Sequence, residues 1–234
     1  MKAVYKRELF SYFTSPIGYV ILAFALCVSG FLFFKVNLQM MSTSIVHFLS
    51  YLSYVLILMV PLMTMHLWAE ERKNKTDQLL LTSDVPVSSI VLGKYFASIT
   101  LFGIFVVAMM IYPMIMSYFG TVSWVNIFVL YLGFFLLASA LLSIGLFVST
   151  LTESQIVSAL GSFAIILFFI LSNILSTKIN LTIIKQLFEW FSVFTRFDNF
   201  IQGIVDVSTI IYYITFSALF IFLSVMSIQR KRWN

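Results

Sequence analysis

The sequence predicts an all-helical integral membrane protein that crosses the bilayer about six times. Hydrophobic residues make up 61% of the 234 residues, and charged residues make up only 10%. A soluble domain usually carries about 25% charged residues, because its surface faces water. The hydrophobic residues also gather into long uncharged runs, and the mean hydropathy is +1.04. Both features favour lipid as the surroundings of most side chains.

Six segments are long enough to cross the hydrocarbon core, which takes about 20 mostly apolar residues in a helix. Their residues do not alternate between polar and apolar as the strands of a membrane barrel do, so helices are expected. Only one segment contains a charged residue, Lys94. The six predicted spans are Ile17–Phe34, Phe48–Trp68, Ile90–Phe119, Val125–Ser149, Gln155–Leu175 and Ile210–Ile228.

The distribution of basic residues predicts that both termini are cytoplasmic. With the N-terminus inside, ten of the 14 Lys and Arg residues fall in cytoplasmic segments, as the positive-inside rule requires. The four expected outside are Lys35, Lys178, Lys185 and Arg196. The formal charge of +5 therefore reflects membrane topology. A nucleic-acid interface would need a dense basic face on a polar surface, so nucleic acid is excluded as a partner.

Residues 1–16 are predicted to form an amphipathic helix that lies in the cytoplasmic interface of the membrane and ends at Ser15-Pro16. The alternative is a frayed, positively charged end that only orients the first span. On a helical wheel one face holds Tyr5, Leu9, Tyr12 and Phe13, and the opposite face holds Arg7, Glu8, Ser11 and Thr14.

The cytoplasmic loop 69–94 is the most charged segment of the chain. Thr76 is a plausible N-cap for a short helix that carries the apolar ridge Leu79-Leu80-Leu81, and Pro86 ends this helix. The ridge is too short to span the membrane. An exposed apolar ridge of this kind needs a protein groove or the membrane surface to cover it.

The outer segment 176–209 has aromatic and aliphatic residues at helical spacing. Leu187, Phe188, Phe191 and Phe194 share one face, so short helices are expected that rest in the outer leaflet or dip into it.

Recognisable catalytic chemistry is missing from the sequence. Gly93-Lys94 lacks the earlier glycine and the following Ser or Thr of a phosphate-binding loop. Two histidines are too few to form a metal site with carboxylates on both sides of the membrane. No ionisable residue lies near the middle of a predicted span, which argues against proton-coupled transport. The polar residues His66 and Asn173 near span ends are expected to contact neighbouring helices.

Four segments, in order, resemble the ATP-binding-cassette type-two permease family, and the likeness extends over nearly the whole chain. It is greatest to the branch of gliding-motility-type permeases. Gln78 stands where this family usually has Glu, and Lys75 where it usually has Gly. The segments are Ser15–Val20 at the entry to the first span; Ala69-Glu70-Glu71-Arg72-Lys73, Gln78-Leu79-Leu80-Leu81-Thr82 and Ile90-Val91-Leu92-Gly93-Lys94 in the loop; Leu151–Val157; and Phe197-Asp198-Asn199-Phe200 with Gly203-Ile204-Val205-Asp206.

The resemblance implies a single permease domain over residues 1–234, in the bacterial inner membrane, that serves as the membrane subunit of an exporter. It implies no catalytic residue, metal or cofactor in this chain. Two permease subunits, identical or related, would pair among the membrane lipids, and two cytoplasmic ATPase subunits would bind ATP and Mg. The resemblance assigns coupling to the ATPase to Glu70, Glu71, Arg72, Thr76, Gln78, Leu79, Leu80, Leu81 and Thr82, and an outer gate to Phe197, Asp198, Phe200, Gly203 and Asp206.

Two other classes of protein remain as alternatives. An ATP-independent channel or carrier would need no partner ATPase. A membrane-embedded lipid-modifying enzyme would need acids, histidines or a Ser and Lys pair grouped at one depth, and the sequence shows no such group. Small residues in the first span, Gly18, Ala23 and Gly30, are candidates for the contact between two permeases.

Overall fold

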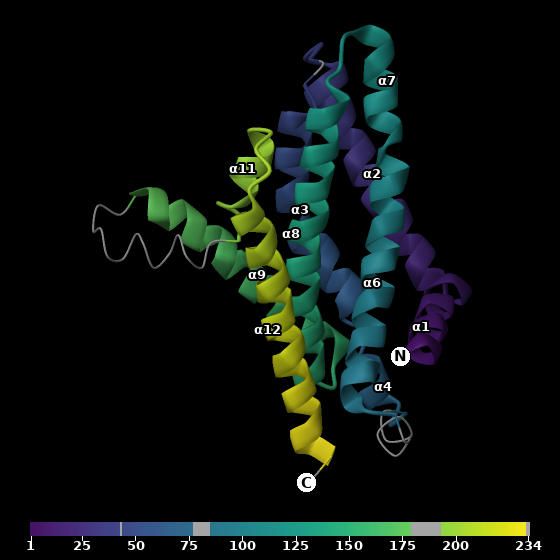
Figure 1. The fold of residues 1–234 in the computed structure, drawn as a ribbon. Coiled ribbons are helices and arrows are strands. Elements are labelled where there is room, and N and C mark those ends of the chain that lie inside the picture. The colour runs from purple at the N-terminus through teal and green to yellow at the C-terminus, as the bar shows by residue number, and fades with distance from the viewer. Residues whose placement is uncertain (43, 77–84, 179–192, 233–234) are drawn as a thin grey trace.

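The computed structural model describes residues 1–42, 44–76, 85–178 and 193–232, and every regular element in these ranges is a helix. Figure 1 shows a bundle of long helices whose lower end lies near both chain termini. The elements are α1 (Lys2–Thr14), α2 (Pro16–Phe33), the π-helix η1 (Phe34–Leu38), α3 (Val46–Thr64), α4 (Ala69–Lys73), α6 (Val87–Met109), α7 (Ile111–Phe119), α8 (Trp124–Leu151), α9 (Gln155–Lys178), α11 (Phe197–Ile201) and α12 (Val207–Arg232).

Helix α8 forms the centre of the bundle and packs against α3, α6, α9 and α12. Most of its side chains are buried, including Leu137, Leu141 and Ile144. Glycines let neighbouring elements approach it closely: a Cβ on Gly145 would collide with Thr64 of α3. Helices α2 and α12, in contrast, leave large apolar side chains exposed along much of their length. Such surfaces suit lipid or a second membrane subunit.

Five described helical segments are long and apolar enough to cross a membrane. Each overlaps one of the predicted spans. The fifth predicted span, Gln155–Leu175, falls in α9, which counts among the shorter apolar helices over Gln155–Leu171. The count of six is therefore not confirmed by helix length alone. The five segments are Pro16–Leu38, Val46–Lys73, Val87–Phe119, Trp124–Leu151 and Val207–Arg230.

The third predicted span is continuous in the sequence, but the structure divides it into α6 and α7 at Met110. Pro113 has no N–H to donate to the carbonyl of Met109, four residues earlier, so the regular hydrogen bonding stops here. The Tyr131 hydroxyl of α8 donates to that carbonyl at 2.9 Å. The freed acceptor is thus satisfied inside the bundle, as an apolar environment requires.

Helix α1 packs against α6 near the lower end of the bundle (Figure 1). Its buried residues are Val4, Glu8 and Tyr12, which share one helical face, and Gly93 of α6 leaves room for Val4. The Tyr12 hydroxyl donates to the Met63 carbonyl at 3.1 Å. The helical wheel was wrong to place Glu8 on the face opposite Tyr12, because residues four apart share a helical face, and the charged partner of Glu8, Lys94, lies on another helix.

Two of the three small residues proposed for subunit pairing face their own chain. A Cβ on Gly18 would collide with the Tyr12 carbonyl, so Gly18 permits the sharp bend between α1 and α2. A Cβ on Gly30 would lie 3.5 Å from the Tyr112 hydroxyl of α7. These two glycines therefore serve contacts within the chain.

Candidate functional site

A buried lysine organises the lower end of the bundle. Lys94 of α6 is fully buried, and its Nζ donates to the Leu67 carbonyl at 2.7 Å. The same Nζ lies 3.0 Å from Glu8 Oε1 and 2.9 Å from Glu71 Oε2. It also lies 5.0 Å from the centre of the Trp68 ring. A buried cation is tolerated when it is paired in this way, since an unpaired one would have lost its hydration without compensation.

Arg7 completes the group from the solvent side. Its Nη2 lies 2.6 Å from Glu8 Oε1 and 2.6 Å from Glu71 Oε1, and half of its side chain is exposed. We call Arg7, Glu8, Glu71 and Lys94 the ion cluster. Its two cations balance its two carboxylates, and it joins three elements that are distant in the sequence: α1, α4 and α6.

The pKa shifts of Glu8 and Arg7, both in α1, agree with this pairing. Burial by itself raises the pKa of Glu8, but the charges and hydrogen bonds of Lys94 and Arg7 outweigh burial and hold this pKa below its ordinary value. Burial lowers the pKa of Arg7, but Glu8 and Glu71 together raise it above its ordinary value. Both side chains are therefore charged at neutral pH.

The first turn of the predicted coupling loop is fixed to the bundle. Ser149 Oγ of α8 accepts hydrogen bonds from the backbone N–H groups of Trp68 and Ala69, at 3.0 and 3.2 Å. These are N–H groups at the start of α4, which has no earlier helical carbonyl of its own to bond. The start of the loop is thus attached to α8 through Ser149 and to α1 and α6 through Glu71.

The structure brings only some of the predicted coupling residues together. Glu70, Glu71 and Arg72 lie in α4, and Thr76 closes the turn after it by donating from Oγ1 to the Glu71 carbonyl at 3.2 Å. Between α1 and α4 lies a cleft of about 250 Å³, whose lining includes Glu70 and Thr76. The remaining predicted coupling residues, Gln78, Leu79, Leu80, Leu81 and Thr82, lie outside the described residues.

The predicted outer residues pack against the upper half of α8. Phe197 and Phe200 of α11 are buried, and Phe200 lies against Gly133, where a Cβ would come within 2.6 Å of the Phe200 Cβ. Gly133 is about 13 Å along α8 from its start at Trp124, at 1.5 Å per residue. The Tyr213 hydroxyl of α12 donates to the Val193 carbonyl at 2.8 Å. This segment therefore descends along the bundle and does not merely cover its upper end.

Gly203 and Asp206 shape the chain between α11 and α12. Gly203 has φ of +76°, a left-handed conformation that suits glycine, and it ends α11. Asp206 caps α12, because its Oδ1 accepts from the Ser208 N–H at 3.0 Å. Asp198 is exposed, and desolvation raises its pKa above the ordinary value. Of the predicted outer residues, Asp198 alone is free of an evident packing or capping role within the described chain.

Replacing Gly133 by Ala is expected to lower the free energy of unfolding by about 1–3 kcal/mol, because the new Cβ displaces the Phe200 ring from a packed contact. The measurement is thermal unfolding of the purified chain in detergent. Gly103→Ala is the matched control, since its Cβ would lie 3.7 Å from the nearest side chain and the change in helix propensity is the same. Equal melting temperatures for the two variants would contradict the close contact.

Sequence reasoning missed the partners of Lys94. The sequence did indicate that such partners exist. Lys94 is the one charged residue inside a predicted span, and a charge at such a position must pair with an opposite charge or a carbonyl. Nothing in the sequence singled out Arg7, Ser149 or Gly133. In the described part of the chain, no three His, Cys, Asp or Glu side chains are grouped so that they could hold a metal ion.

The helical bundle with several apolar helices of membrane-crossing length defines a multi-pass membrane protein. Residues 35–228 match the sequence pattern of a family described as "ABC-2 family transporter protein". This match covers most of the chain, which therefore belongs to the ABC-2 family and is the permease component of an ABC transporter. No curated protein sequence matches it significantly.

Proposed function

We propose that this chain is the membrane subunit of an ATP-driven exporter, that two permease subunits pair, and that a separate ATPase binds at the loop after α3. The family match over residues 35–228 carries this proposal. The attachment of α4 supports it in physical terms. Because Ser149 and the ion cluster attach α4 to α8, α1 and α6, a displacement of the loop would move these helices with it.

We further propose six crossings with both termini in the cytoplasm of a bacterial cell. Helix α8 ends in the lower part of the bundle, and α12 begins in its upper half, so the chain must return upward between these two helices (Figure 1). The lower end carries the basic residues Arg72, Lys73 and Lys75 in or near α4, and Arg230 near the end of α12. The positive-inside rule therefore supports a cytoplasmic lower end, with α1 at the inner membrane interface.

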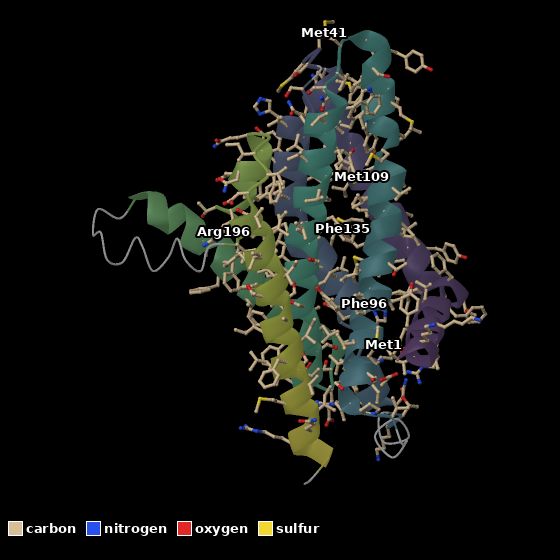
Figure 2. All side chains as sticks on the ribbon, viewed as in Figure 1. Met1, Met41, Phe96, Met109, Phe135 and Arg196 are labelled. Atoms are coloured by element: carbon tan, nitrogen blue, oxygen red, sulfur yellow. The ribbon has the colours of Figure 1, made fainter. Side chains whose placement is uncertain are left out.

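The orientation predicts opposite labelling of two exposed positions. Met41 lies at the upper end, and Asn74 follows α4 at the other end of the bundle (Figures 1 and 2). In a Cys27→Ser background, Met41→Cys should react with a membrane-impermeant maleimide in intact spheroplasts. Asn74→Cys should react only after the membrane is permeabilised. Reaction of Asn74→Cys in sealed spheroplasts would exclude the proposed orientation.

The function itself is tested by co-expression with the ABC ATPase that we expect to be encoded beside this chain. We expect the two proteins to co-purify and the ATPase to hydrolyse ATP faster in proteoliposomes with the permease than without it. A Walker-lysine variant of the ATPase serves as the control for background hydrolysis. If the permease alone moves solutes at the same rate with and without ATP, the protein is a channel or carrier and the proposal is wrong.

A further inference from the structure

An arginine that the topology assigned to the outer side lies well down the bundle. Figure 2 shows Arg196 at about the level of Phe135, near the middle of α8. Its guanidinium carbon lies 4.2 Å from the centre of the Tyr212 ring of α12. Tyr212 is itself about 7–8 Å along α12 from Val207, at 1.5 Å per residue. If α8 and α12 cross the membrane, this guanidinium lies within the outer half of the hydrocarbon region.

The guanidinium is incompletely satisfied. Arg196 Nε is buried and has no hydrogen-bond partner, and no carboxylate in the described ranges forms an ion pair with this side chain. Asp198, two residues further on, is exposed and is not joined to it. A cation–π contact offsets part of the loss of hydration, but it satisfies none of the five N–H donors of a guanidinium. A charged group at this depth is expected to have an anionic partner.

Exposed aliphatic side chains precede and follow Tyr212, the aromatic partner of Arg196, along the chain. Ile211 and Ile214 of α12 and Ile204 and Val205 of the preceding turn are more than half exposed. A cation next to exposed aliphatic side chains is complementary to a molecule that has both an anionic headgroup and an acyl chain. A small hydrophilic anion would match the guanidinium but would leave the aliphatic surface uncovered.

We propose that Arg196 binds the phosphate of an anionic amphiphile, such as a phosphatidylglycerol of the outer leaflet, whose acyl chain lies along α12. Arginine is suited to this contact because its planar N–H groups can bind two phosphate oxygens together. This site is a property of the chain alone. Its test needs no ATPase, and its outcome is separate from that of the proposed export function.

The test is native mass spectrometry of the purified full chain with dioleoyl phosphatidylglycerol or dioleoyl phosphatidylcholine. Wild-type protein should retain the anionic lipid preferentially, and Arg196→Gln should weaken its retention by about tenfold, the usual scale for loss of a charge-assisted contact. Arg196→Lys should keep part of the preference. Arg230→Gln, a matched loss of an exposed arginine near the other end of α12, should retain the wild-type preference.

Several outcomes would overturn the proposal. Equal binding of both lipids by wild-type protein, or equal losses in Arg196→Gln and Arg230→Gln, would show that no specific site exists. Displacement of the lipid by millimolar inorganic phosphate would identify a free anion as the ligand. If Asp198→Asn and Arg196→Gln both convert dimers to monomers without changing lipid retention, Arg196 pairs with a second copy. Should Arg196→Gln fold poorly, a photoactivatable phosphatidylglycerol must label residues 193–214 of wild-type protein, and labelling only elsewhere would refute the site.

Discussion

Replacing Lys94 by Met is expected to lower the free energy of unfolding by about 3–5 kcal/mol, the usual cost of removing one member of a buried ion pair. The substitution keeps a long apolar side chain but leaves the carboxylates of Glu8 and Glu71 together, with only the half-exposed Arg7 between them. The measurement is chemical or thermal unfolding in detergent. Lys73→Met, which removes an exposed lysine of α4, should change stability by no more than about 0.5 kcal/mol.

A double variant separates loss of the pair from loss of packing. Glu8→Gln together with Lys94→Met should recover part of the stability lost in Lys94→Met, because one of the two opposed carboxylates is then neutral. If the two substitutions are simply additive, Lys94 and Glu8 do not interact and the ion cluster as described is wrong.

The pH dependence of stability should be weaker in the Lys94→Met variant than in the wild type. In the wild type the pKa of Glu8 is lowered in the folded state. Its contribution to stability is therefore present above the unfolded pKa of about 4.3 and is lost as the pH falls through the folded pKa. Without Lys94, two of the interactions that lower the folded pKa of Glu8 are lost, while burial still raises this pKa and Arg7 still lowers it. The variant should therefore lose less stability than the wild type as the pH falls from 6 towards 4.

The second large effect is expected from the apolar ridge of the proposed coupling loop. Replacing Leu79 and Leu80 by Ser should abolish co-purification of the ATPase and all ATP-dependent transport. Burying two leucines in a protein groove contributes about 3–6 kcal/mol before ordering costs, at about 1.5–3 kcal/mol per side chain. Membrane insertion and permease pairing should be unchanged, because α4 remains attached to the bundle by Ser149 and the ion cluster.

Comparison with charge variants sharpens this test. Arg72→Gln should slow association with the ATPase more than it weakens the final complex, since charged residues at the edge of an interface mainly steer encounter. If the Leu79→Ser, Leu80→Ser protein still binds the ATPase and stimulates it, the ridge lies on the membrane surface and is not the coupling element.

The sequence by itself determined the class of the protein. A low fraction of charged residues and long apolar runs are properties of composition and order, and the constraints of lipid turn them directly into helices. The family resemblance could also be recognised from short segments in the right order, and the family match confirms it. Five of the six predicted spans correspond to helices of membrane-crossing length, because hydrophobic length is a local property.

Only the tertiary structure decided which residues act together. Glu8 and Lys94 are 86 residues apart, so no local periodicity could show that a polar position of α1 faces a charged position of α6. Local periodicity also could not show that Ser149 of α8 bonds the backbone at the start of α4, or that Phe200 packs against Gly133. The depth of Arg196 also depends on how the outer segment descends along the bundle. Each of these contacts follows from packing between helices, where the position of a side chain depends on the partner as much as on its own sequence.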